Sequence, residues 1–153
     1  MLHGLICAPL WNAYTDAYVK QDFAWMRRTV RRMLWLMVPV CAGTGLLALL
    51  MDWLVALWIR MPLDISPALC VGGAWFVIIS CFNNIWSYFL NGIGRVQLQM
   101  YLSILSAVSV IPLAWWLMDL YGAAGMLLAT SLCLTLAGLP QTAQVVLFLR
   151  RHA

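Results

Sequence analysis

The 153-residue chain is 65% hydrophobic and only 9% charged, and its mean hydropathy is +0.90. Soluble domains are about 45–50% apolar and about 25% charged, so a water-soluble globule of this composition would expose large apolar patches and aggregate. Intrinsic disorder is also excluded, because it requires low hydrophobicity and high net charge. The composition therefore predicts an integral membrane protein embedded in a lipid bilayer.

The first 33 residues differ from the rest. Residues 1–10 are apolar but too short to span a membrane, and we interpret them as the last turns of an earlier helix. In residues 11–33, four arginines occupy one arc of a helical wheel, while Phe23, Met26 and Val30 lie on the other. We therefore expect residues 1–33 to form a helix stub followed by a basic amphipathic helix in the plane of the headgroups.

Four apolar segments follow, each long enough to cross a hydrocarbon core, which takes about 20 helical residues. They cover residues 34–59, 67–90, 96–118 and 122–149. None of them alternates between apolar and polar residues, as the strands of a membrane β-barrel do. The sequence predicts an all-α, polytopic membrane protein, with a four-helix transmembrane region over residues 34–153.

Most of the nine Lys and Arg residues lie at the ends of the apolar segments. Four arginines precede the first span, Arg95 lies between the second and third, and Arg150 and Arg151 follow the fourth, whereas Arg60 lies on the opposite side. The positive-inside rule then predicts that both termini are cytoplasmic. A nucleic-acid partner is not expected, because its binding surface would place cations among polar neighbours.

The sequence offers no pattern typical of catalysis or metal binding. The five cysteines lie within apolar stretches and lack the close pairing of a disulfide framework or zinc site. His3 and His152 have no partner at metal-ligand spacing. With no nucleophile–base pair and only short loops, we predict neither an enzyme nor a bound cofactor.

Two stretches, residues 9–28 and 82–99, carry motifs beyond those of a generic membrane protein. The first has a P-x-W-x-A-Y helix end followed by a basic segment that contains an acid, and the second has an L-N-G-x-G turn before Arg95. A G-x-x-G helix start follows at Gly122. Together these motifs resemble the C-terminal half of bacterial polysaccharide-biosynthesis membrane proteins, the O-antigen and lipid-linked oligosaccharide flippases of the multidrug/oligosaccharidyl-lipid/polysaccharide exporter (MOP, MATE-like) superfamily.

The resemblance implies a two-lobed transporter of the bacterial inner membrane, whose central cavity opens to alternate sides. This chain would supply part of one lobe, and a missing N-terminal lobe or a partner chain would complete the cavity. The substrate would be a polyprenyl-linked oligosaccharide. Two alternatives remain: a fragment of a cation-coupled multidrug exporter of the MATE type, and a small membrane scaffold subunit that transports nothing.

Three groups of residues are candidates for a site. Asn83 and Asn84 lie deep in the second span, where they either link neighbouring helices or face a water-filled cavity that accepts sugar hydroxyls. Asp52 is the ionisable residue well inside a span, so it is a candidate for cation or proton coupling unless it reaches the interface.

The third group is the arginine cluster Arg27, Arg28, Arg31 and Arg32. Its guanidinium groups could contact the pyrophosphate of a lipid-linked sugar. Alternatively, they could fix the topology by binding anionic lipid headgroups.

Overall fold

The computed structural model describes residues 2–59 and 66–151, except for the side chains of residues 2–8, Asp52 and Ile59. Of the described residues, 93% are helical and none forms a strand, which confirms the all-α class. The helices are α1 (Leu2–Val19), α2 (Phe23–Leu49), α3 (Met51–Ile59), α4 (Pro67–Gly92), α5 (Gln97–Tyr121) and α6 (Ala123–Arg151).

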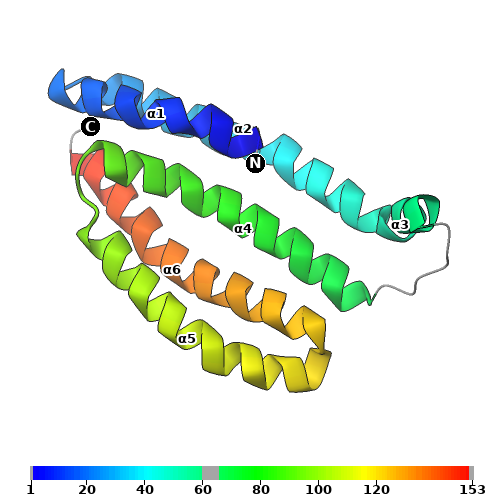
Figure 1. Ribbon diagram of the computed structural model, residues 1–153. Coiled ribbons are helices and arrows are strands. Elements are labelled where there is room, and N and C mark those ends of the chain that lie inside the picture. The colour runs from blue at the N-terminus through cyan, green and yellow to red at the C-terminus, as the bar shows by residue number, and fades with distance from the viewer. Residues whose placement is uncertain (1, 60–65, 152–153) are drawn as a thin grey trace.

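Four of these helices, α2, α4, α5 and α6, are long and apolar enough to cross a membrane. Helices α1 and α2 form an antiparallel pair that lies along one side of α4, and α6 runs between α4 and α5 (Figure 1). The α1–α2 turn, the α4–α5 turn and the end of α6 lie together at one end of the bundle. All Lys and Arg residues of the described segments lie near this end, which we call the basic end.

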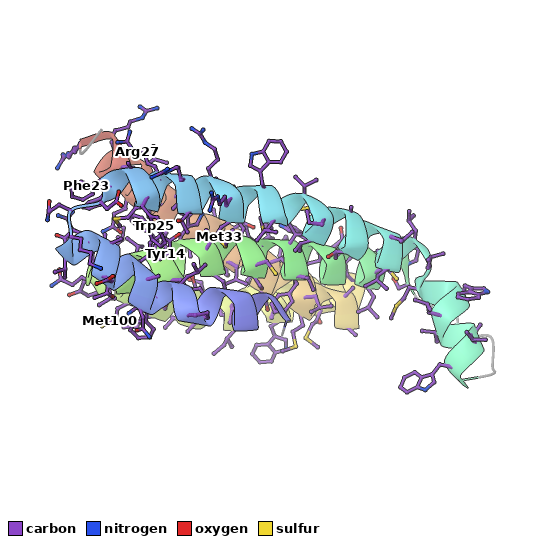
Figure 2. The ribbon with its side chains drawn as sticks, turned by 90° about the horizontal axis from the view of Figure 1, so that it is seen from above. Tyr14, Phe23, Trp25, Arg27, Met33 and Met100 are labelled. Carbon is purple, nitrogen blue, oxygen red and sulfur yellow. The ribbon has the colours of Figure 1, made fainter. Side chains whose placement is uncertain are left out.

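The start of the first span differs from the expected boundaries. The segment that contains the four arginines and the start of the first apolar span form one continuous helix, α2. Residues 11–19 belong to α1 instead of a separate interfacial helix. Two local features separate α1 from α2: Gln21 has a φ of 59°, which ends α1, and an oxygen of Asp22 accepts a hydrogen bond of 2.9 Å from the Trp25 backbone N–H. Helix α2 ends at Leu49, and α3 leaves its axis (Figure 2).

Aromatic rings join the helices at the basic end. The ring centroids of Tyr14 on α1 and Phe89 on α4 are 5.2 Å apart, and those of Phe89 and Phe148 on α6 are 5.9 Å apart. Both pairs have edge-to-face geometry. Such pairs each contribute about 0.5–1.5 kcal/mol beyond the burial of their area. The Arg95 guanidinium lies 5.1 Å from the centre of the Phe148 ring, so the α4–α5 turn is held against α6 as well.

A glycine allows α1 and α4 to approach closely near this cluster. A Cβ placed on Gly92 would lie 2.5 Å from the Cβ of Tyr14 and 3.2 Å from the carbonyl oxygen of Trp11. Tyr14 and Gly92 belong to the two stretches that carry the family resemblance. The two motifs therefore form one packing contact between α1 and α4.

The substitution Gly92→Ala should destabilise the protein, because the added methyl group meets the backbone of α1. We expect a loss of about 1–3 kcal/mol, the usual cost of overpacking a tight contact. Thermal unfolding in detergent, followed by helical circular dichroism, measures this loss.

Gly73→Ala on the same helix is the matched control, because a Cβ there meets only Leu127, at 4.0 Å. This control should be neutral or stabilising, by up to about 1 kcal/mol. If Gly92→Ala unfolds at the same temperature as Gly73→Ala, then α1 does not pack on α4 as described.

Candidate functional site

A cleft with a volume of about 310 Å³ lies between α4, α5 and α6, and most of its lining side chains are polar. We call it the polar cleft. Its residues are Ser80, Asn83, Asn84 and Ser87 of α4, Gln99, Ser103 and Ser106 of α5, and Leu134, Ala137 and Gln141 of α6. The apolar composition of the surrounding helices makes this concentration of amides and hydroxyls unusual.

The spacing of the polar residues explains why they face one space. On α4 and on α5 they recur every three or four residues, which places them on a single face of each helix. Helices α4 and α5 both pack along α6 but make almost no contact with each other. The polar faces of α4 and α5 are therefore left on either side of a gap that α6 closes from behind.

Asn83 connects two of the three helices. Its side chain is 8% exposed, and its Nδ2 donates a hydrogen bond of 2.8 Å to the carbonyl oxygen of Leu134 on α6. The Oδ1 atom lies directly over Gly138, where any Cβ would collide with it. This contact supports the interpretation of Asn83 as a packing residue, and it explains why position 138 carries no side chain.

Three carboxamide oxygens lining the cleft have no hydrogen-bond partner in the described part of the protein: Asn83 Oδ1, Gln99 Oε1 and Gln141 Oε1. Gln141 is only 5% exposed. Leaving a buried acceptor unpaired costs about 1–3 kcal/mol. Water or the donors of a ligand would remove this cost, so the cleft is suited to a hydrogen-bond donor.

The structure separates the candidate groups predicted from the sequence. Asn83 and Asn84 both line the cleft, and Asn84 is exposed. The arginine cluster lies on α2, which contributes no residue to the cleft. The side chain of Asp52 lies outside the described residues, so its proposed coupling role stays a prediction.

No ionisable side chain lines the polar cleft. The described residues also contain no group of His, Cys, Asp or Glu side chains that could hold a metal ion. The serines of α4 and α5, together with Gln99, were not singled out from the sequence as residues of a site. Their three- and four-residue spacing was the signal that could have identified them.

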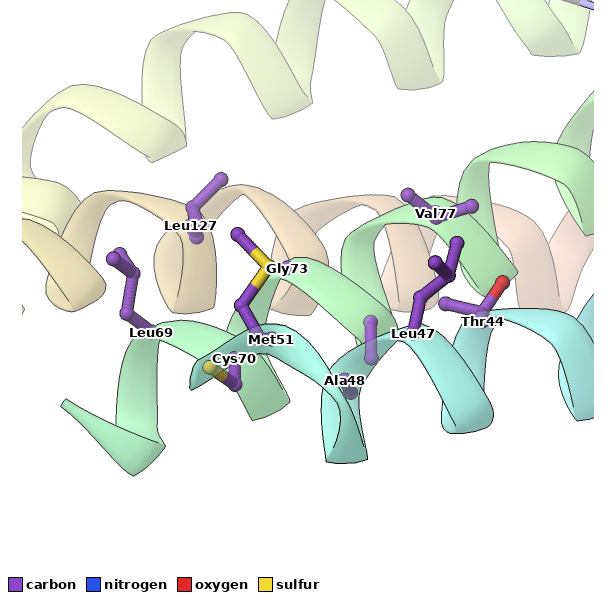
Figure 3. Close-up of a pocket in the computed structure, with 10 residues that line it drawn as sticks. Thr44, Leu47, Ala48, Met51, Leu69, Cys70, Gly73, Val77 and Leu127 are labelled. Atoms are coloured by element: carbon purple, nitrogen blue, oxygen red, sulfur yellow. The ribbon is translucent and has the colours of Figure 1, made fainter. Parts of the chain in front are cut away.

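A second cavity contrasts with the polar cleft. The groove between α2 and α4, toward the end opposite the basic end, has a volume of about 390 Å³ and an almost wholly apolar lining (Figure 3). The hydroxyl of Thr44, which lines it, donates to the carbonyl oxygen of Val40 on its own helix. This groove therefore offers little to a polar ligand, and the polar cleft is the candidate site.

No protein-family model, curated protein or solved structure matches this chain. A functional assignment consequently depends on the motifs and on the chemistry of the cleft.

Replacing each cleft asparagine by leucine should distinguish the residue that packs against α6 from the residue that only lines the cleft. Asn83→Leu removes the hydrogen bond to Leu134 and should lower the free energy of unfolding by about 0.6–2 kcal/mol, the range for polar contacts between membrane helices. Asn84→Leu should leave it unchanged, because Asn84 is exposed at the cleft. Unfolding in mixed micelles measures both values, and an equal loss for the two variants would contradict the assignment of Asn83 as the packing residue.

Proposed function

We propose that this chain forms part of one lobe of a membrane transporter, and that the polar cleft lies on the substrate pathway. The substrate of the complete transporter is a lipid-linked oligosaccharide, which moves across the bacterial inner membrane. The observation that carries the proposal is that three side chains with a carboxamide oxygen unpaired in the described residues line one cleft of a largely apolar helix bundle.

The chemistry of the cleft favours a sugar over other cargo. Sugar hydroxyls can donate hydrogen bonds to the carboxamide oxygens and accept from the amides and serine hydroxyls. An exporter of organic cations would instead benefit from a carboxylate in its pathway, and the cleft contains none. A purely structural scaffold is also less well supported, because packing alone would pair these oxygens with protein donors.

The cleft has walls on only part of its circumference. Helices α4, α5 and α6 provide them, and the exposed side chains of Asn84 and Ser103 face outward. Polar groups at membrane depth are costly in contact with lipid, so a further protein segment is required opposite them. In the proposal, this segment is the missing N-terminal lobe or a partner chain.

The distribution of charge gives the proposed orientation. With the basic end in the cytoplasm, the α1–α2 turn, the α4–α5 turn and the end of α6 are cytoplasmic. In this orientation the end of α6 lies on the cytoplasmic side, and α1 starts part-way along the bundle (Figure 1).

Water should reach the cleft from solution. In a background without native cysteines, Ser103→Cys should react with a water-soluble thiosulfonate at least about tenfold faster than Ile104→Cys, because the reactive thiolate forms only where water is present. The two positions are adjacent on α5, but only Ser103 lines the cleft. Equal, slow labelling of both thiols would contradict a water-filled pathway.

Transport itself can be tested in the bacterium that encodes the chain. Deleting its gene should cause lipid-linked oligosaccharide to accumulate in the cytoplasmic leaflet, and the wild-type gene should restore export. Asn84→Leu should restore about tenfold less export at equal expression, as expected from the loss of hydrogen bonding worth about 1.5 kcal/mol.

Ile104→Leu, outside the cleft, should restore export fully. Normal oligosaccharide export in the deletion strain would contradict the proposed function. Full rescue by Asn84→Leu would show that the cleft is not part of the substrate pathway.

A further inference from the structure

The outward face of α2 carries arginines followed by apolar side chains in one line. Arg28, Arg31, Leu34, Trp35 and Val38 recur every three or four residues and share this face. The last four line a shallow groove of about 430 Å³ on the surface of the helix. We call these five residues the α2 column.

The column is not covered by the rest of the bundle. Trp35 is 70% exposed and Val38 is 58% exposed, whereas the buried residues Met26, Val30 and Met37 of the same helix belong to the core. Arg28 and Arg31 are also exposed. The column consequently faces the surrounding bilayer.

The order of chemical groups along the column matches that of a phospholipid. Arg28 and Arg31 lie nearest the basic end, Leu34 and Trp35 follow, and Val38 lies farther toward the membrane interior. Guanidinium groups pair with phosphate oxygens, indole rings lie at the headgroup level, and aliphatic side chains contact acyl chains. We propose that the α2 column is a binding site for one anionic phospholipid of the leaflet at the basic end.

Charge complementarity supports an anionic ligand. Helix α2 contains four arginines and no Asp or Glu. The nearby carboxylates are engaged elsewhere: Asp22 accepts from the backbone of Trp25, and Asp16 lies 2.6 Å from the ammonium group of Lys20. A lipid phosphate whose headgroup carries no compensating cation, as in phosphatidylglycerol, would supply a countercharge beside Arg28 and Arg31.

The position of the column distinguishes a bilayer lipid from the transported substrate. No residue of α2 lines the polar cleft, and α4 lies between α2 and α5. A lipid bound at the α2 column therefore occupies a surface that shares no lining residue with the polar cleft. The inference is therefore independent of the proposed function.

The test uses the full chain reconstituted in phosphatidylcholine bilayers with a small amount of spin-labelled phosphatidylglycerol or spin-labelled phosphatidylcholine. The electron spin resonance spectrum gives the relative association constant of each labelled lipid. We expect the chain to prefer phosphatidylglycerol, and Arg31→Gln to reduce that preference about fivefold, since each arginine near an anionic lipid contributes about 1 kcal/mol.

Arg32→Gln is the control with the same change of charge, because Arg32 lies about 100° around α2 from Arg31 and, unlike Arg31, does not line the groove. It should reduce the preference by less than about twofold. Equal reductions for Arg31→Gln and Arg32→Gln would overturn the proposed site in favour of diffuse charge attraction. Displacement of the labelled lipid by millimolar inorganic pyrophosphate would overturn the assignment to a phospholipid, and unchanged helicity of both variants confirms that the fold is intact.

Discussion

A carboxamide oxygen inside a membrane must find a hydrogen-bond donor, because the surrounding hydrocarbon provides none. This constraint applies to every polar group of the bundle that lies at membrane depth. The backbone carbonyl oxygens find their donors by forming helices. The Asn83 amide donates a hydrogen bond to the carbonyl oxygen of Leu134, but this bond leaves Asn83 Oδ1 without a donor in the described residues. Buried carboxamide oxygens without a partner in the described residues belong to Asn83, Gln99 and Gln141, which all line one cleft, and to Gln144 outside it. The cleft is therefore where most of these groups would gain from water or a ligand.

The packing of α4 and α5 on α6 leaves space for this cleft. Phe148 of α6 contacts Phe89 of α4 and the guanidinium of Arg95, so α4, the α4–α5 turn and α6 are joined at the basic end. Farther along the bundle, α5 packs on α6 and makes almost no contact with α4. The polar faces of α4 and α5 are thus held apart, while Gly138 leaves room for Asn83 against α6. The polar cleft is a local exception to the apolar composition that first indicated a membrane protein. The proposed transport function depends on this cleft.

The sequence predicted the spans well where hydropathy and helix-ending residues agree. The segments expected at 67–90, 96–118 and 122–149 correspond to α4, α5 and α6 within a few residues. The first span differed because the Asp22 cap starts α2 ahead of the arginines, and a capping bond is a local interaction that a hydropathy window does not register. Asn83 and Asn84 were identified as candidates because amides are rare in spans. The position of Gln99 beside these asparagines could not be predicted, because it depends on how α5 packs against α6.

Water-edited solid-state NMR on the chain in bilayers tests the central claim most directly, because it measures the transfer of magnetisation from water to individual side chains. The account predicts rapid transfer to the carboxamide groups of Gln99 and Gln141, much faster than to the side chains of Leu105 and Val108, which are exposed on α5 outside the polar cleft. Transfer to these carboxamides as slow as to Leu105 and Val108 would contradict it, because the polar cleft would then be dry and could not lie on a path for a sugar.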